Sequence, residues 1–497
     1  MAANNASSLT TGRLLVRNTV WNLIGNGAPL FVAFFCLPIL VRGLGKERFG
    51  VLTLVWALVG YAGLFDFGLG RALTQLVAKK LGAGEEQEVA SLAWTSLLMM
   101  LLLGLVGAAF LVLLSPWLVH RILSVPVGLQ RETLQSFYLL GITVPVVIIT
   151  TGLRGLLEAH QRFDLVNMLR VPMGVITLAS PLLVLPFSRN LFPVVGVLAA
   201  GRLIACVAHL LLCFEVAPEL RERIKWRRTA AGPLLRFGGW MTVTNVVGPL
   251  MVTLDRFVIG ALVSMTAVAY YATPYEAVTK LLVIPGAFLG VMFPAFSTTF
   301  AQDRSRALLL YKRSVKYIFL ILFPIVVLIV VLSRDGLNLW LGAEFAHNSA
   351  RVLRWLAVGV FINSLAQVPF AMVQGAGRPD WTAKLHIIEL PVYLGFLWLM
   401  IHWWGIEGAA IAWTLRMAVD AGFLFVLASR FLPGRVLGDL RCLLILVISG
   451  GVFATAALIQ GSLAKGIFLS VTIASFAFLT WFLILTPEER ALTQGSR

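Results

Sequence analysis

Fourteen apolar runs, each long enough to cross a lipid bilayer, constrain the fold of this chain more than any other feature of its sequence. A membrane-spanning helix needs about 20 mostly apolar residues, and only a helix or a closed barrel satisfies its own backbone in lipid. The sequence therefore predicts an all-α polytopic membrane protein with 14 transmembrane helices. The runs occupy residues 14–41, 49–70, 89–115, 133–157, 167–187, 192–215, 234–263, 267–296, 314–333, 352–376, 382–402, 405–431, 441–460 and 464–486.

The composition agrees with this class of protein. Only 13% of the 497 residues are charged, whereas about a quarter are charged in a soluble domain. The formal net charge is +17, and most Lys and Arg residues fall on alternate connections. The positive-inside rule then places both termini in the cytoplasm and accounts for the basic excess, so no nucleic-acid partner is expected. The four cysteines have no CxxC spacing, so we expect neither a disulfide framework nor a metal site.

The two halves of the chain resemble each other. WNLIGNGAP, starting at Trp21, and WMTVTNVVGP, starting at Trp240, share a Trp, an Asn five residues later and a Pro near the end. Matches at two further places have nearly the same offset, which indicates an internal repeat. We predict an N-terminal lobe of six spans at 1–215, a basic cytoplasmic linker at 216–232, a C-terminal lobe of six spans at 233–431, and two further spans with a cytoplasmic tail at 432–497.

Six spans per lobe is an even number, so both lobes enter the membrane from the same side. A pseudo-two-fold axis along the membrane normal would relate them, as in transporters that rock two bundles about a central site. We therefore expect the substrate path to lie between the lobes.

Polar residues in the first span form a stripe that such a path would use. Asn22 and Asn26 stand one turn apart on one face, and Arg17 lies beside them at the cytoplasmic end. Polar stripes also hold membrane helices together without lining any cavity. Both interpretations of the asparagines remain open.

The seventh span carries an acid and a base side by side. Asn245 and Arg256 share a face, and Arg256 lies about 30 Å along the helix from Arg236. A cation held over a cleft there can bind an anion. Asp255 points away by about 100 degrees, and it either anchors the helix or carries a proton or a cation.

Three further places hold ionisable residues within or at the end of a span. Glu276 and Lys280 are one turn apart in the eighth span, with Tyr275 on the polar side, and they line the path or neutralise each other. Arg202 has no acid one turn away and needs a partner on another helix, or an anion. Asp66, in FDFGLGRALTQ, closes the second span, where a structural role is favoured over gating or ion coupling.

Four stretches carry a resemblance to the multidrug/oligosaccharidyl-lipid/polysaccharide exporter superfamily, and within it to the Wzx-type polysaccharide flippases. They are RNTVWNLIGNGAPLFVAFFCLPILVRGLGKERFGVLTLVWALVG from Arg17 to Gly60, the DFGLG that follows, LDRFVIG leading to VAYY, and GIEGAAIA from Gly405. The resemblance implies a flippase for undecaprenyl-diphosphate-linked oligosaccharide, such as an O-antigen unit, in the bacterial inner membrane. It also implies alternating access, coupling to H⁺ or Na⁺ with no other cofactor, and a polymerase and glycosyltransferases as partners.

The resemblance makes Arg256 and Lys280 cations of the central cavity, with Arg17 at its mouth. The sequence departs from the family at Ala269, where glycine is common. Two alternatives stay open: a proton- or sodium-coupled multidrug exporter of the same superfamily, and a membrane enzyme of polysaccharide assembly. The first needs a cavity richer in acids than in bases, and the second needs a sizeable external loop with acidic residues. We therefore expect a transporter and no catalytic residue.

Overall fold

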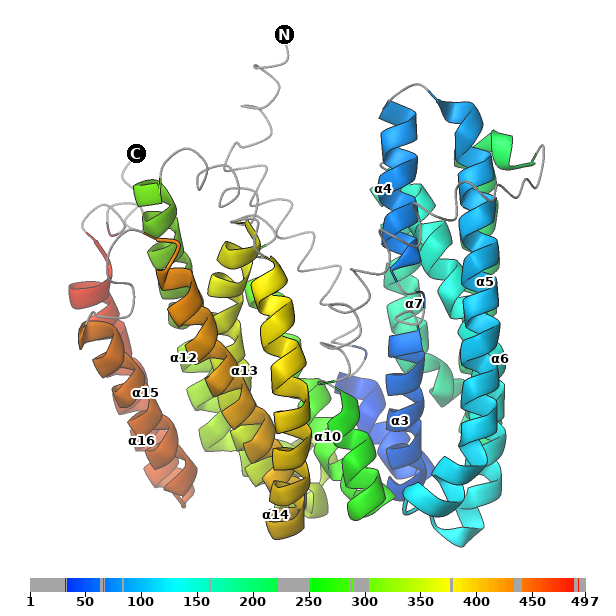
Figure 1. Ribbon diagram of the computed structural model, residues 1–497. Coiled ribbons are helices and arrows are strands. Elements are labelled where there is room, and N and C mark those ends of the chain that lie inside the picture. The colour runs from blue at the N-terminus through cyan, green and yellow to red at the C-terminus, as the bar shows by residue number, and fades with distance from the viewer. Residues whose placement is uncertain are drawn as a thin grey trace. The chain divides into compact units, whose positions relative to one another are not determined.

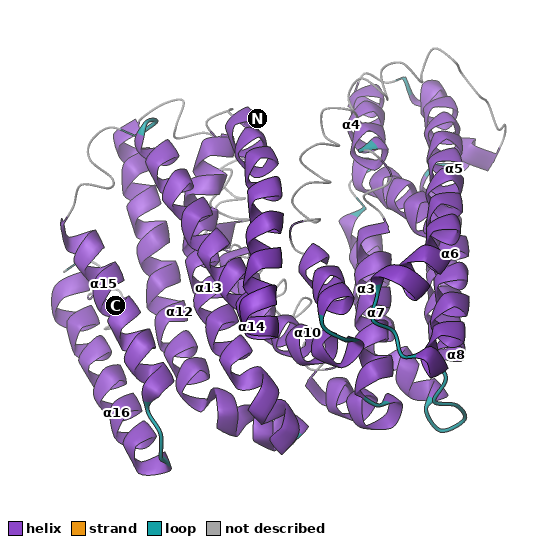
Figure 2. Cartoon of the chain, turned by 60° about the horizontal axis from the view of Figure 1, so that its bottom comes forward, coloured by secondary structure: helices purple, strands orange, loops and turns teal. Residues whose placement is uncertain are grey.

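The computed structural model describes residues 34–62, 68–82, 85–160, 162–221, 253–286, 304–375, 379–432 and 440–486, with the single positions 32, 66, 251, 288, 289 and 490. Within these residues every regular element is a helix, and no strand occurs (Figure 2). Eight helices of the described part are long and apolar enough to cross a membrane. The expected all-α membrane architecture is therefore confirmed.

Twelve longer helices of the described residues are labelled in chain order, most of them in Figure 1. They are α3 (Lys46–Ala62), α4 (Leu69–Gly82), α5 (Glu86–Trp117), α6 (Val127–Ala159), α7 (Phe163–Val184), α8 (Leu191–Val216), α10 (Met265–Thr279), α12 (Arg304–Leu341), α13 (Ala343–Gly375), α14 (Pro379–Ser429), α15 (Leu440–Leu458) and α16 (Ser462–Leu479). A shorter apolar helix, Phe34–Leu44, precedes α3. Residues 253–262 are also helical.

The helix α14 is interrupted near its middle. Trp404 and Gly405 have non-helical backbone angles, and Gly405 has φ 56°, a conformation that glycine adopts without the steric cost other residues meet. The interruption lies between the predicted spans 382–402 and 405–431, so one glycine converts a continuous apolar stretch into two helical segments.

The chain divides into two compact units. Unit 1 comprises Met1–Leu23, Pro274–Leu385 and Glu407–Arg497, and unit 2 comprises Ile24–Thr273 and His386–Ile406. Each unit is described by itself below. The core of unit 2 is built where α4, α5, α6 and α8 meet, around Leu73, Ala93, Ile148, Leu156 and Cys213.

A buried acid ties three helices of unit 2 together. The Glu132 side chain, on α6, is only 6% exposed and pairs with the Arg48 Nε of α3 at 2.7 Å. Its second carboxylate oxygen accepts a hydrogen bond from the Leu191 backbone N–H, at the start of α8, at 3.1 Å. A buried carboxylate is stable only when its oxygens have such partners. Glu132 therefore fixes the first turns of α6 and α8 against α3.

A cluster of aromatic rings packs together in unit 1. Phe323 of α12 stacks on Phe476 of α16 at 4.9 Å, and it packs against Phe453 of α15 at 5.5 Å. Phe361 of α13 lies 5.4 Å from Phe453, and Phe319 stacks on Phe323 at 5.3 Å. These five residues, the phenylalanine cluster, join the last two helices to α12 and α13.

Three polar contacts supplement the phenylalanine cluster. Arg354 of α13 donates to the Ser333 hydroxyl at 2.7 Å and to the Ala457 carbonyl at 2.8 Å. Lys465, at the start of α16, pairs with Asp335 of α12. The most apolar stretch of α13 is 72% buried and that of α16 is 0% buried, so α13 lies inside unit 1 and α16 at its periphery.

We expect Glu132→Ala to lower the free energy of unfolding by about 3 kcal/mol, because Arg48 and the buried Leu191 N–H both lose their acceptor. Denaturant unfolding in mild detergent, followed by tryptophan fluorescence, measures the change. Glu85→Ala is the matched control, since Glu85 pairs with Lys80 with its side chain 49% exposed. Exposed pairs contribute about 1 kcal/mol or less. Equal losses in the two variants would contradict the role of Glu132.

Candidate functional site

A cavity of about 490 Å³ lies within unit 2, enclosed by α4, α6, α7 and α8 with the end of α3. Hydroxyl-bearing and ionisable side chains line it beside apolar ones. Its hydroxyl groups belong to Thr74, Thr150, Thr151 and Thr177, and its ionisable groups to Asp66, Arg154, Glu158, Arg170, Arg202 and His209. Ionisable residues inside membrane segments usually face water or a bound ligand, because lipid cannot solvate them.

Helical spacing gathers these side chains on the inner faces of their helices. On α6, Thr150, Arg154 and Glu158 stand at i, i+4 and i+8, and on α8, Arg202 and His209 are seven residues apart. Residues at these spacings share one face of a helix. The polar wall is therefore a direct product of the sequence.

The cations occupy two depths. Arg154 lies near the end of α6 and Arg170 in the second turn of α7, and a short connection joins these two helix ends. Thr177, which contacts Arg202, lies seven residues beyond Arg170, about 10 Å further along α7. Arg202 lies near the middle of α8, so it is the inner cation and Arg154 and Arg170 are the outer ones.

Arg202 makes little contact with other protein groups. Its Nη2 donates to the Thr177 hydroxyl at 3.3 Å, and no carboxylate lies within 4.0 Å of it in the part of the chain that the structure describes. A guanidinium offers five N–H donors in a planar fork that matches a phosphate or carboxylate. The remaining donors are available to water or to an anion in the cavity.

The acids of the cavity are already engaged. Asp66 accepts from the backbone N–H groups of Gly68 at 2.8 Å and Gly70 at 3.2 Å, and from the Thr151 hydroxyl at 3.2 Å. It thus caps the start of α4 and ties it to α6. Glu158 pairs with Arg154 at 3.4 Å. Among the described residues, three arginines and two acids line the cavity, so its arginines outnumber its acids by one.

Two glycines make this arrangement possible. Gly68 has φ +75°, which lets the chain turn back so that its N–H reaches Asp66. A Cβ on Gly155 would lie 2.5 Å from the Thr74 hydroxyl oxygen and 2.9 Å from the Gly70 carbonyl oxygen. Only glycine at this place allows α6 to approach α4. The close approach of α6 to α4 beside Asp66 fits the structural role that the sequence favoured for this residue.

His209 lies at an intermediate depth and is buried. Its Nδ1 is 2.8 Å from the Ala205 carbonyl oxygen, and since a carbonyl only accepts, the proton is on Nδ1. The ring therefore keeps Nε2 for the cavity.

Asp255 and Arg256 are both buried in unit 2, at 0% and 5% exposure. The Tyr271 hydroxyl, on α10, donates to Asp255 Oδ2 at 2.5 Å, and the Arg256 backbone N–H donates to Oδ1 at 2.8 Å. This geometry favours the anchoring role for Asp255, because it fastens helix 253–262 to α10. The assignments of Arg256 to the substrate path and of Asp255 to ion coupling remain predictions.

The pair expected in the eighth span is present in unit 1. Lys280 Nζ lies 3.5 Å from Glu276, with the side chains 40% and 31% exposed. Tyr275 is buried and packs edge-on against Trp413, with ring centroids 5.7 Å apart. Arg17, Asn22, Asn26 and Asn245 lie outside the described residues.

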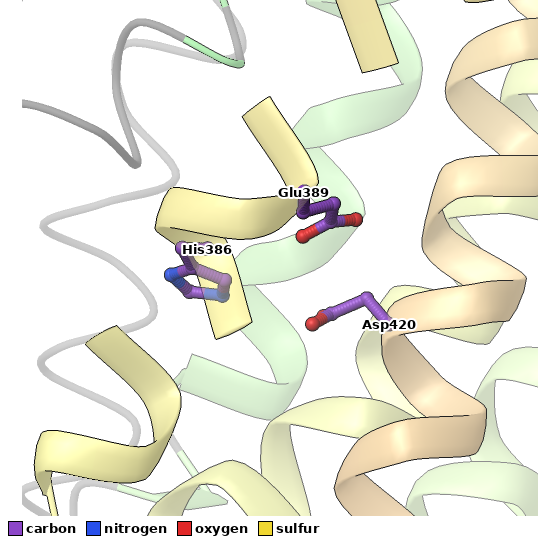
Figure 3. Close-up of side chains that lie close together, drawn as sticks. All are labelled: His386, Glu389 and Asp420. Atoms are coloured by element: carbon purple, nitrogen blue, oxygen red, sulfur yellow. The ribbon is translucent and has the colours of Figure 1, made fainter. Parts of the chain in front are cut away.

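The helix α14 carries three side chains of types that ligate metals, His386, Glu389 and Asp420 (Figure 3). His386 and Glu389 are one helical turn apart in the segment that belongs to unit 2, and Asp420 is in the segment that belongs to unit 1. The expectation of no metal site stays a prediction.

The cavity brings together Asp66 and Arg202 of the predicted site residues. It adds Arg154, Glu158 and Arg170, which the sequence pattern alone did not single out. The i, i+4, i+8 stripe on α6 was a detectable signal in the sequence. The approach of α6 to α8 was not detectable without the fold.

We expect Tyr271→Phe to lower the free energy of unfolding by about 2 kcal/mol, because a buried carboxylate loses a charged hydrogen bond. Tyr138→Phe is the matched control, since the Tyr138 hydroxyl is half-buried on α6. In the double variant Tyr271→Phe/Asp255→Asn, part of the loss should return because the buried group is neutral. Equal free energies of unfolding for Tyr271→Phe and Tyr138→Phe would contradict the anchoring of Asp255 by Tyr271.

The comparisons with known proteins agree with this picture. Residues 15–300 match the family model described as polysaccharide biosynthesis protein. A putative O-antigen transporter of Shigella flexneri is 33% identical over 423 residues, covering 84% of this chain and 98% of the relative. A probable low-salt glycan biosynthesis flippase, Agl15 of Haloferax volcanii, is 22% identical over 82% of each chain.

Solved structures confirm the fold. A multidrug resistance MATE family transporter of the MOP superfamily, in an inward-facing conformation, is similar with a TM-score of 0.70. The match covers 82% of this chain and 98% of the transporter at 17% identity, so it speaks for the fold alone. The resemblance found in the sequence is confirmed by the family model and the relatives. The chain belongs to the polysaccharide biosynthesis protein family.

Proposed function

We propose that this protein is a flippase that moves a lipid-linked oligosaccharide, carried on undecaprenyl diphosphate, across the bacterial inner membrane. Membership of the polysaccharide biosynthesis family supports this function, as do the printed names of its relatives, an O-antigen transporter and a glycan biosynthesis flippase. The observation that carries it is Arg202, a guanidinium at the middle of a membrane helix, with no carboxylate within 4.0 Å among the described residues, facing a polar cavity.

The chemistry of the substrate explains why such a cavity is needed. A diphosphate and its sugars cannot cross a hydrocarbon layer about 30 Å thick without a replacement for their water. Arginine binds phosphate through two parallel N–H donors, and threonine hydroxyls offer bonds to phosphate or sugar oxygens. The polyprenyl tail stays in lipid while the head group passes through the protein.

The basic connections indicate how the cavity is oriented in the membrane. Under the positive-inside rule, the end at which α6 stops and α7 begins is cytoplasmic, with both termini on the same side. The cavity then reaches from the cytoplasmic end of unit 2 to Arg202, close to the bilayer midplane. A head group made in the cytoplasm meets Arg154 and Arg170 first and Arg202 last.

The finer architecture belongs to the same proposal. Fourteen spans would form two six-helix lobes, at 1–215 and 233–431, with the linker 216–232 between them and the spans of 432–497 appended. The lobes alternate access by rocking, and a H⁺ or Na⁺ gradient supplies the energy, with Asp66, Asp255 and Glu276 as candidate coupling residues. Arg256, Lys280 and Arg17 would guide the head group between the lobes, and a polymerase and glycosyltransferases would act after and before transport.

The two alternatives find less support in the cavity. A drug exporter for cations is disfavoured by three arginines around a space whose two acids already have partners. The likeness to a MATE transporter concerns the fold and not the ligand. An enzyme of polysaccharide assembly would need a free carboxylate as acid or base, and neither Asp66 nor Glu158 offers one.

The test is the thermal stability of the purified protein with added polyprenyl diphosphate-sugar, polyprenyl monophosphate or a lipophilic cation. We expect the diphosphate lipid to raise the melting temperature, because a ligand bound to the folded state stabilises it. In Arg202→Gln the affinity should fall roughly tenfold or more, as expected for a lost charged hydrogen bond. Arg256→Ala, measured in parallel, tests the predicted path between the lobes.

Arg189→Gln is the matched control. This substitution removes the same charge, and Arg189 is exposed at the other end of unit 2. Stabilisation by the cation alone, indifferent to Arg202 and Arg256, would return the drug exporter as the better assignment.

A further inference from the structure

The two acids of the cavity are held in very different ways. Asp66 accepts three hydrogen bonds, two of them from backbone N–H groups that cannot leave without unwinding the start of α4. Glu158 contacts only Arg154 among the described residues, at 3.4 Å, one helical turn away on α6. Asp66 is therefore a fixed part of the fold, whereas Glu158 is held by a single ion pair.

That ion pair is weak enough to be exchanged. The side chains of Arg154 and Glu158 are 47% and 34% exposed, and both line the cavity. Pairs with this exposure contribute about 1 kcal/mol or less, because water solvates both charges when they separate. A phosphate that reaches Arg154 makes shorter and stronger hydrogen bonds than a carboxylate at 3.4 Å. Glu158 can swing away on its three rotatable bonds without moving α6.

We propose that Glu158 is a displaceable counter-ion, and that an incoming phosphate group takes its place on Arg154 at the entrance of the cavity. The inference rests on the proposed function, since it concerns the same cavity and the same head group. Glu158 pairs with Arg154 when no phosphate is present, and it competes with phosphate for this arginine.

The two depths of the cavity give this exchange a consequence. The outer cations and Arg202 are separated by about 10 Å along the helices. A phosphate group that moves inward from Arg154 to Arg202 leaves the outer cation. When the phosphate moves on, Glu158 pairs with Arg154 again. The positive charge of Arg154 therefore has a counter-ion throughout the movement of the phosphate. Glu158 lowers the affinity of the entrance and eases departure from it.

The decisive variant is Glu158→Gln, which keeps the shape of the side chain and removes its charge. Binding of inorganic pyrophosphate is measured by titration calorimetry at fixed salt, with the whole protein in phosphatidylcholine discs. We expect the dissociation constant to fall about threefold in Glu158→Gln, because the competitor for Arg154 is gone. Glu215→Gln is the matched control, since Glu215 is exposed on α8 and does not line the cavity. It should leave the constant unchanged.

The outcomes separate the inference from the proposed function. If the wild type does not bind pyrophosphate, the cavity is no anion site and the proposed function loses its main support. If the wild type binds and Glu158→Gln binds equally or more weakly, only the displaceable counter-ion is overturned. A lower melting temperature with an unchanged dissociation constant would mean that Glu158 merely stabilises α6.

A second measurement distinguishes two sources of phosphate. Discs that contain phosphatidylglycerol offer lipid headgroups at high density. If pyrophosphate affinity persists there and the threefold difference between variant and wild type is retained, the site takes the diphosphate of a substrate. If the affinity collapses in both proteins, the cavity holds the headgroup of a bulk lipid, and the inference is overturned.

Discussion

The free-energy cost of placing a guanidinium halfway along a membrane helix explains the polar groups found around Arg202 in unit 2. Arg202 cannot be deprotonated at any physiological pH, and an ionised group in hydrocarbon costs several kcal/mol. The chain meets this cost by lining the surrounding space with hydroxyls and further ionisable groups, so that Arg202 faces a polar cavity of about 490 Å³ instead of lipid. Everything that shapes the cavity follows from that need. Gly155 brings α4 close to α6, Asp66 caps α4 where it enters the wall, and Glu132 fixes the far ends of α6 and α8.

The sequence predicted the parts of this structure that depend on one helix at a time. Apolar runs gave the spanning helices, and the spacing of Glu276 and Lys280 gave their ion pair, because both are local properties. A structural role was favoured for Asp66, and its hydrogen bonds to the start of α4 and to Thr151 fit that role. Arg202 was recognised as a residue in need of a partner or an anion, since a lone charge in an apolar run is costly wherever the helix lies.

What the sequence did not predict depends on how helices face one another. Arg154, Glu158 and Arg170 lie close to span ends, where basic residues normally serve topology, and only the packing of α6 against α7 and α8 turns them into cavity groups. Glu132 gave no signal of its own, because its partners are 84 and 59 residues away along the chain. The donor to Asp255 came from Tyr271, sixteen residues further on. Periodicity within one helix contains no information about such partners.

The phenylalanine cluster has a consequence for how the last two helices are held in a bilayer. In water, removing α15 and α16 would uncover apolar rings and unfold the remainder, but in a bilayer the acyl chains are as apolar as the rings they would replace. Loss of the last two helices would therefore remove packing contacts between rings, but the exposed rings would still be surrounded by apolar acyl chains. The polar contacts that would break are those of Asp335 with Lys465 and of Arg354 with the Ala457 carbonyl. The last two helices are thus held to unit 1 by close ring packing and a few polar contacts, because a bilayer adds no hydrophobic drive for apolar helices to associate.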